Sequence, residues 1–255
     1  MLKKVRIAIL IVFVLLGLSS LAVQADSPRI KVLQVDGVIN PVSADYVIKG
    51  IEDAENAGDY AVIIELDTPG GLYDSMMDMV QGILDAEIPV IVYVSPSGSR
   101  AASAGVFVTM AGHTAAMSPN TVIGAAHPVS ISSEGSEQEM SEEMSEKVTN
   151  DAVAYIRSIA ETRGRNADWV EEAVRESVSI DEKEALKQNV IDIVASDLDD
   201  LLAQMNGRVV TLAGGEEVTL DTIDAEIYRA DMNLIEDFLF TITNPNIAYI
   251  LLSIG

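Results

Sequence analysis

The sequence predicts an α/β fold. From Ile30 onward, short apolar runs alternate with longer segments in which apolar residues recur at three- to four-residue spacing. Residues 61–66 and 90–94 are short and apolar enough to form buried strands, and residues 72–84 between them carry a helical stripe of methionine and aliphatic side chains. The order strand, turn, helix repeats along the chain, so the units can wind as one open sheet or as a stacked spiral.

The remaining elements follow from the same patterns and from local helix signals. Ser43 is expected to cap the first helix and Gly58 to end it, Asn166 or Asp168 to start a later one, and Asp181 to cap a short one. Further strands are expected at residues 31–35, 114–117, 122–126 and 190–194, and further helices at 104–111, 148–162, 181–188 and 196–205.

The first 25 residues have the features of a signal peptide. Lys3, Lys4 and Arg6 form a basic start, residues 7–18 are apolar, and small residues end the segment at Ala25. Cleavage there would make Asp26 the first mature residue. An uncleaved anchor is the alternative, and in both cases the sequence predicts an exported chain on the extracytoplasmic face of the cell membrane.

The rest of the chain divides into a main domain and two shorter segments. Residues 26–206 form the predicted α/β domain, and residues 207–230 a small hairpin linker around Gly214-Gly215. Residues 231–255 are largely apolar and are split by Asn244-Pro245-Asn246. They are interpreted either as an interfacial helix with a short extension or, preferably, as the start of a membrane region.

Composition narrows the chemistry. Forty acidic and 16 basic side chains give a net charge of −24, which argues against nucleic acid or anionic lipid as the main partner. The absence of cysteine excludes thiolate and disulfide chemistry. With only two histidines besides, the sequence predicts no metal site and no cofactor.

One segment interrupts the α/β pattern. Residues 131–146 contain six glutamates and lack a continuous apolar face. They are expected to form a mobile loop or lid with a hydrated surface.

A serine among small residues is the strongest candidate for chemistry. Ser103 follows the strand at residues 90–94 and precedes a predicted helix, where small neighbours would let a substrate carbonyl approach the hydroxyl. The Ala104 amide can face the oxyanion formed on attack, and the pair Gly70-Gly71 after another strand offers a second donor.

The serine needs a base, and the residues alone leave three candidates. His113 lies at the end of the helix behind Ser103, His127 follows a small-residue segment that can line a cleft, and Lys147 follows the glutamate-rich segment. A lysine base must be neutral, which requires burial or a nearby positive charge. His127 is the better of the two histidines, and composition does not select Lys147.

Four motifs in this order resemble the NfeD-type membrane-bound serine proteases. They are DTPGG at residues 67–71, RAASAG at 100–105, SPNTVIGAAHP at 118–128 and KVTN at 147–150. The resemblance covers about residues 30–202. It implies the ClpP/crotonase spiral of repeated β-β-α units, shared with signal peptide peptidase A and the Clp protease subunit.

The resemblance assigns roles to individual residues. Ser103 matches the nucleophile and Lys147 the general base of a Ser-Lys dyad, while Gly71 and Ala104 match the oxyanion hole, and Gly70 and His127 are expected to bind substrate. It further implies a homodimeric, membrane-associated serine endopeptidase that cuts apolar segments of membrane proteins, with a stomatin-like protein as the partner. The long members continue into transmembrane helices and a small β-barrel, so this chain is expected to correspond to their first part.

Two other functions remain open at this point. A membrane-assembly module would use the same fold to dimerise and to hold a stomatin-like partner, with Ser103 only a small packing residue. A crotonase-like acyl-CoA enzyme would use the same oxyanion hole with acidic groups for proton transfer to carbon, but an export signal argues against it.

Overall fold

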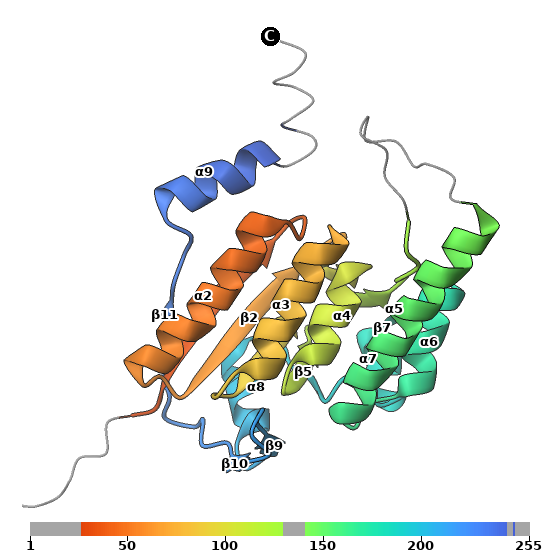
Figure 1. The fold of residues 1–255 in the computed structure, drawn as a ribbon. Helices are drawn as coiled ribbons and strands as arrows, with labels where there is room; N and C mark the ends of the chain where they lie inside the picture. The colour runs from red at the N-terminus through yellow and green to blue at the C-terminus, as the bar shows by residue number, and fades with distance from the viewer. Residues whose placement is uncertain (1–26, 130–140, 244–246, 248–255) are drawn as a thin grey trace, which may run out of the picture.

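The protein is built around a six-stranded parallel sheet (Figure 1). The computed structural model describes residues 27–129, 141–243 and 247. The strand order is β11-β1-β2-β3-β5-β8, and the strands are β1 (Arg29–Asp36), β2 (Ala61–Asp67), β3 (Val90–Val94), β5 (Thr114–Met117), β8 (Ile193–Val194) and β11 (Glu226–Arg229).

Alternate residues of the strands enter two apolar cores on opposite faces of this sheet. In β1, Leu33 and Val35 belong to one core, whereas Ile30 and Val32 belong to the other. The first core is covered by α2 (Pro41–Ala57), α3 (Tyr73–Asp85), α4 (Ala104–Ala111), α5 (Glu142–Thr162), α6 (Ala167–Arg175) and α7 (Glu182–Lys187). The second is covered by α8 (Leu198–Met205) and by the antiparallel hairpin of β9 (Val209–Thr211) and β10 (Glu217–Thr219).

A second, three-stranded sheet stands at the end of the main sheet where α4 begins. It consists of β4 (Arg100–Ala102), β6 (Val122–Gly124) and β7 (Ser179–Asp181), in that order. Because β3 leads to β4 and then to α4, this part of the chain is a β-β-α unit. Single bridges from Ile39 to Gly71 and from Thr68 to Ala101 connect the loops before α2 and α3 to the same region.

Most of the predicted elements are present, and the differences have local causes. Asn40, rather than Ser43, caps α2, because Ser43 is the third residue of a capping box that Asn40 begins. The helix predicted from residue 148 begins at Glu142, where the Ser141 hydroxyl accepts a hydrogen bond from the Met144 amide. Acidic side chains in this first turn are compatible with a helix, since they face the positive end of its dipole.

The segment after residue 206, predicted to be a hairpin linker, also contributes a strand to the main sheet. The hairpin is present, but β11 then joins the main sheet beside β1, with Arg29 opposite Glu226. Last comes α9 (Leu234–Thr243). The predicted signal peptide and most of the predicted loop at 131–146 lie outside the described residues, and among the described helices none combines the length and apolarity needed to cross a bilayer.

Candidate active site

Ser103 occupies a constrained turn between β4 and α4. Its φ of 51° and ψ of −113° lie in a region that residues with a side chain rarely adopt. Such a conformation costs about 1–3 kcal/mol and persists only where neighbouring contacts impose it. Here the Ser103 amide donates to the carbonyl oxygens of Ala125 (3.1 Å) and Gly124 (3.3 Å), which ties the turn to the end of β6.

The Gly70-Gly71 turn lies directly against this serine. Gly70 has φ 115°, and a Cβ atom there would lie 2.6 Å from the Ser103 Cβ, so only glycine permits this approach. Thr68 joins the two turns, because its amide donates to the Arg100 carbonyl (2.8 Å) and its carbonyl accepts from the Ala102 amide (3.1 Å). The nucleophile turn and the glycine turn are therefore held in one unit.

Among the described residues, two backbone amides near Ser103 take no part in the hydrogen bonds that join the surrounding strands and turns. The bridge between Ile39 and Gly71 is made by the amides of Ile39 and Leu72, so it does not use the Gly71 amide. Ala104 is the first residue of α4, where amides have no partner inside the helix. Both groups are available for a bound carbonyl oxygen, and the α4 N-terminus adds a positive dipole end.

An apolar cavity of about 270 Å³ opens beside these groups. Gly71, Ser103 and Ala104 line one part of it. The rest is lined by Leu72, Tyr73, Met76, Phe107, Ala126, Pro128, Val129, Val148 and Ala152. The arrangement presents a hydroxyl and two amide donors at the edge of a recess suited to an apolar side chain.

The small-residue segment that ends at Ala126 was expected to line a cleft and does so, but the other apolar walls of the cavity were not identified from the sequence. Phe107 stacks on Tyr155 with ring centroids 6.3 Å apart, and the Tyr73 hydroxyl donates to Asp151 at 3.2 Å. These contacts join α3 and α4 to α5. Only the position of Leu72 and Tyr73 directly after the glycine pair signals a role in the sequence.

Lys147 and Ser103 stand in different surroundings. The Lys147 side chain is 67% exposed, and its Nζ atom pairs with the Glu143 carboxylate one turn earlier at 2.8 Å. Val148, the next residue, lines the cavity, but Lys147 is not among the lining residues. The structure therefore brings the Lys147 backbone to the rim while the amine points toward solvent.

Neither histidine lies at the cavity surface. The Nδ1 atom of half-buried His127 is 2.9 Å from the Val174 carbonyl, and the cavity is lined by residues on either side of His127 rather than by its own side chain. The buried His113 ring accepts a hydrogen bond from the Val90 amide at 3.1 Å. Burial, together with the positive charge of Arg163, lowers the pKa of His113 to about 3, so this residue is a neutral core group.

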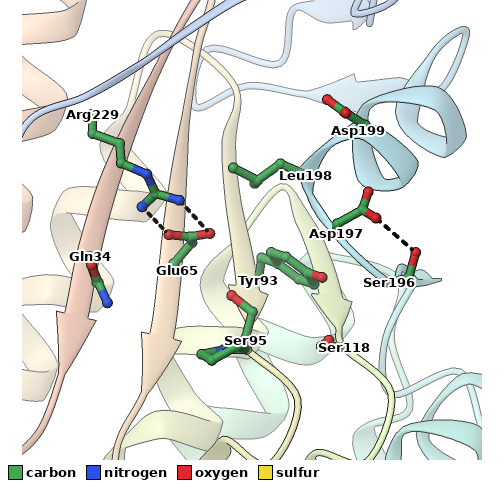
Figure 2. Close-up of a pocket in the computed structure, with 11 residues that line it drawn as sticks. Gln34, Glu65, Tyr93, Ser95, Ser118, Ser196, Asp197, Leu198, Asp199 and Arg229 are labelled. Carbon is green, nitrogen blue, oxygen red and sulfur yellow. Dashed lines mark hydrogen bonds and ion pairs between the residues drawn. The ribbon is translucent and has the colours of Figure 1, made fainter.

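A second cavity, of about 590 Å³, lies at another part of the main sheet (Figure 2). It crosses β1, β2 and β3, where Glu65 forms a two-point ion pair with Arg229. Its serines include Ser196, whose hydroxyl donates to Asp200 at 3.2 Å. This cavity is larger and more polar, but none of the residues that line it has the strained backbone conformation found at Ser103. Among residues 27–129 and 141–243, no cluster of three histidine or acidic side chains is placed to hold a metal ion.

Known proteins with similar sequences and structures agree on one family. The family described as NfeD1b, N-terminal domain, matches residues 29–210. The membrane-bound protease PH1510 of Pyrococcus horikoshii is 41% identical over 226 residues, which are 88% of this chain and 50% of that protein. The membrane protein NfeD1b of Bacillus subtilis is 33% identical over 126 residues, 49% of this chain and 28% of that protein.

A solved structure of the 1510-N membrane-bound stomatin-specific protease is similar over nearly its whole length. This lysine-to-alanine mutant, in complex with a substrate peptide, has a TM-score of 0.79 and 38% identity, covering 86% of this chain and 99% of that one. A serine-to-alanine mutant of 1510-N has a TM-score of 0.74 and 40% identity over 80% of this chain and 98% of that one.

The fold itself extends to more distant proteins. ClpP1 from Listeria monocytogenes has a TM-score of 0.54 at 17% identity, over 67% of this chain and 94% of that one, which supports the predicted α/β fold with a ClpP-like parallel sheet. The chain spans about half the length of PH1510 and less of NfeD1b. Since the match runs through both sheets and the Ser103 turn, the chain belongs to the NfeD1b N-terminal domain family.

Proposed function

We propose that this chain is a membrane-associated serine endopeptidase that uses Ser103 as its nucleophile and Lys147 as its general base. The observation that carries the proposal is the Ser103 turn, strained at φ 51° and packed against Gly70 beside two available amides. The relative that is named a stomatin-specific protease, with its serine and lysine mutants, supports the same assignment.

The reaction would proceed by acyl transfer. Neutral Lys147 would take the proton of the Ser103 hydroxyl, the oxygen would attack the scissile carbonyl, and the amides of Gly71 and Ala104 would donate to the oxyanion. The lysine would return the proton to the leaving amine and then activate water to release the acyl group.

The base has to change its position for this chemistry. Its Nζ atom pairs with Glu143 in solvent, whereas its neighbour Val148 lines the cavity. A change of side-chain conformation, with a small movement at the start of α5, would bring the amine to the cavity rim. An amine loses its proton more readily when it is buried among apolar groups, so substrate that fills the recess would assist the step.

The cavity supports the choice of substrate. Its walls are the side chains of apolar and aromatic residues such as Leu72, Met76 and Phe107, which favour an apolar residue next to the cleaved bond. We extend the proposal to apolar segments of membrane proteins, with a stomatin-like partner, a homodimeric enzyme and a location on the extracytoplasmic face. Gly70 would support the substrate backbone, and His127 would shape the wall from behind.

One observation favours a second function. The exposed, ion-paired Lys147 is what a catalytically silent assembly module would present, with Ser103 as a packing residue. Such a module would bind the same apolar segment and leave it intact.

Cleavage of an apolar peptide separates the two functions. Wild-type protein is expected to cut a fluorogenic peptide of this kind, and Ser103→Ala and Lys147→Ala to lose at least about a thousandfold in kcat/KM. Lys183→Ala, another exposed lysine, is the matched control and should retain full activity. If the wild-type protein leaves the peptide intact, and both it and Ser103→Ala bind the peptide, the chain is an assembly module. If either Ser103→Ala or Lys147→Ala still cleaves the peptide, the Ser-Lys dyad is refuted.

A further inference from the structure

The last helix of the described residues, α9, turns its apolar side chains outward. Four residues form what we call the α9 apolar face, and their exposed fractions are 90% for Leu234, 71% for Ile235, 62% for Phe238 and 41% for Leu239. Figure 1 shows α9 crossing above the start of α2. A surface helix normally buries its apolar stripe, so this orientation leaves a contiguous apolar patch without cover in the described chain.

Contacts at both ends fix this orientation. The Thr243 hydroxyl accepts a hydrogen bond from the Asn40 side chain at 2.9 Å, and the Phe240 ring approaches Gly37 so closely that a Cβ atom there would lie 3.1 Å from it. Before the helix, the Tyr46 hydroxyl donates to the Ala230 carbonyl at 2.6 Å. The inward side of α9 is therefore already occupied, and the helix cannot bury its outer face by rotating in place.

We propose that the α9 apolar face lies in the interfacial layer of a lipid bilayer and docks the domain on the membrane. The ten residues of α9 extend only about 15 Å, half of a bilayer core, so the helix suits a position in the plane of the interface. The sequence that follows, residues 244–255, has no charged residue, and after Asn244-Pro245-Asn246 it is largely apolar.

The charge of the region specifies the lipid. Glu236 and Asp237 are the only charged residues of α9, and the whole chain carries −24. Acidic groups are repelled by anionic headgroups, so the face fits a zwitterionic surface.

Docking there would bring the membrane close to the Ser103 cavity. Gly37, which contacts Phe240, lies two residues before Ile39, and the Ile39 backbone bridges to Gly71 in the cavity wall. The inference does not rest on peptidase activity, because it requires only the position of α9.

The chain contains no cysteine, so single cysteines can be labelled specifically. In the full chain, Phe238→Cys on the apolar face and Asp237→Cys on the polar flank would each carry a polarity-sensitive fluorophore. With phosphatidylcholine vesicles, the label at 238 is expected to shift to the blue and to be quenched by lipid-borne spin labels, while the label at 237 stays in water. The fluorescence of these labels reports the surroundings of α9 itself, so it does not depend on whether residues 7–18 also bind the membrane.

Other outcomes would overturn the proposal. If the label at 238 remains in water when vesicles are added, α9 does not dock on the membrane. If that label becomes shielded from water without vesicles as the protein concentration rises, a second copy of the chain covers the face instead. A response that requires anionic lipid contradicts the zwitterionic assignment. Leu234→Gln with Phe238→Gln should weaken the lipid contact of a label at Leu239→Cys at least about tenfold, and no change would count against the face.

Discussion

The two sides of the Ser103 cavity differ in how firmly the fold sets their chemistry. On the serine side, Ser103, Gly70 and Thr68 are locked by backbone hydrogen bonds and by a contact that only glycine permits. On the other side, Lys147 stands in the second turn of α5 with an exposed amine and one ion pair.

The difference indicates which part of the site is built in advance. Preorganised donors act without rearrangement when charge develops, and the serine side has this property. The lysine side needs a change of side-chain conformation first. In the proposed enzyme, substrate binding would therefore complete the site on the α5 side.

The largest expected effect comes from disturbing the rigid side. Gly71→Ala places a Cβ atom 2.0 Å from the Ile39 carbonyl oxygen, which is backbone and cannot move aside cheaply. We expect the free energy of unfolding to fall by about 3 kcal/mol and peptide cleavage to be lost. Denaturant unfolding and a cleavage assay measure both.

A glycine in open space provides the control for this change. A Cβ atom at Gly214 would meet nothing within 4 Å, so Gly214→Ala should leave stability within about 0.5 kcal/mol of wild type. If Gly71→Ala were equally harmless, the serine side would not be the rigid half that the contacts indicate.

The sequence predicted the serine side better than the lysine side for a physical reason. Buried parallel strands and the small residues around Ser103 leave local patterns, and the positions of β2, β3 and α4 were confirmed almost to the residue. Whether a lysine is neutral depends on its burial, which no local pattern records, so the role of Lys147 and that of His127 stay predictions.

Elements stabilised by distant partners were also missed. β11 looks like a linker because it carries charged residues, and its place in the sheet depends on Tyr228 donating to Asp59 and on Arg229 pairing with Glu65. Both partners lie more than 160 residues earlier in the chain. β4 is only three residues long, too short for a periodic signal.

Acid is expected to lower the free energy of unfolding through His113, which lies just after the end of α4. His113 has a pKa of about 3 in the folded protein, against 6.5 in an unfolded chain, so between these values only the unfolded state binds a proton. Stability should therefore fall as pH falls below about 6.5, by up to about 1.4 kcal/mol per pH unit from this group.

Comparison of two proteins isolates this contribution. Several carboxyl groups also have lowered pKa values, among them Glu171 beside Arg175, and they add to acid sensitivity in both proteins. The slope of unfolding free energy between pH 6 and 4 should be shallower in His113→Gln than in wild type. As a direct check, the His113 ring signal in proton NMR should not titrate above about pH 4. A ring that titrates near 6 would mean that this end of α4 is open to water.

The smallest expected effect concerns the lysine side and tests most directly whether the ion pair restrains the base. Glu143→Gln removes the ion pair that holds the Lys147 amine in solvent. An exposed pair of this spacing is worth about 0.3–0.5 kcal/mol, so the unpaired amine should become about twofold more available and kcat/KM should rise by about that factor. The gain should vanish at 1 M salt, where the pair is screened in wild type as well.

Glu146→Gln removes the same charge from the same part of α5 without breaking the pair between Lys147 and Glu143. If Glu146→Gln raises kcat/KM as much as Glu143→Gln does, the loss of one negative charge explains both increases, and the ion pair with Glu143 does not restrain Lys147. If Glu143→Gln instead lowers activity, Glu143 assists the reaction, and the exposed pair already belongs to the working site.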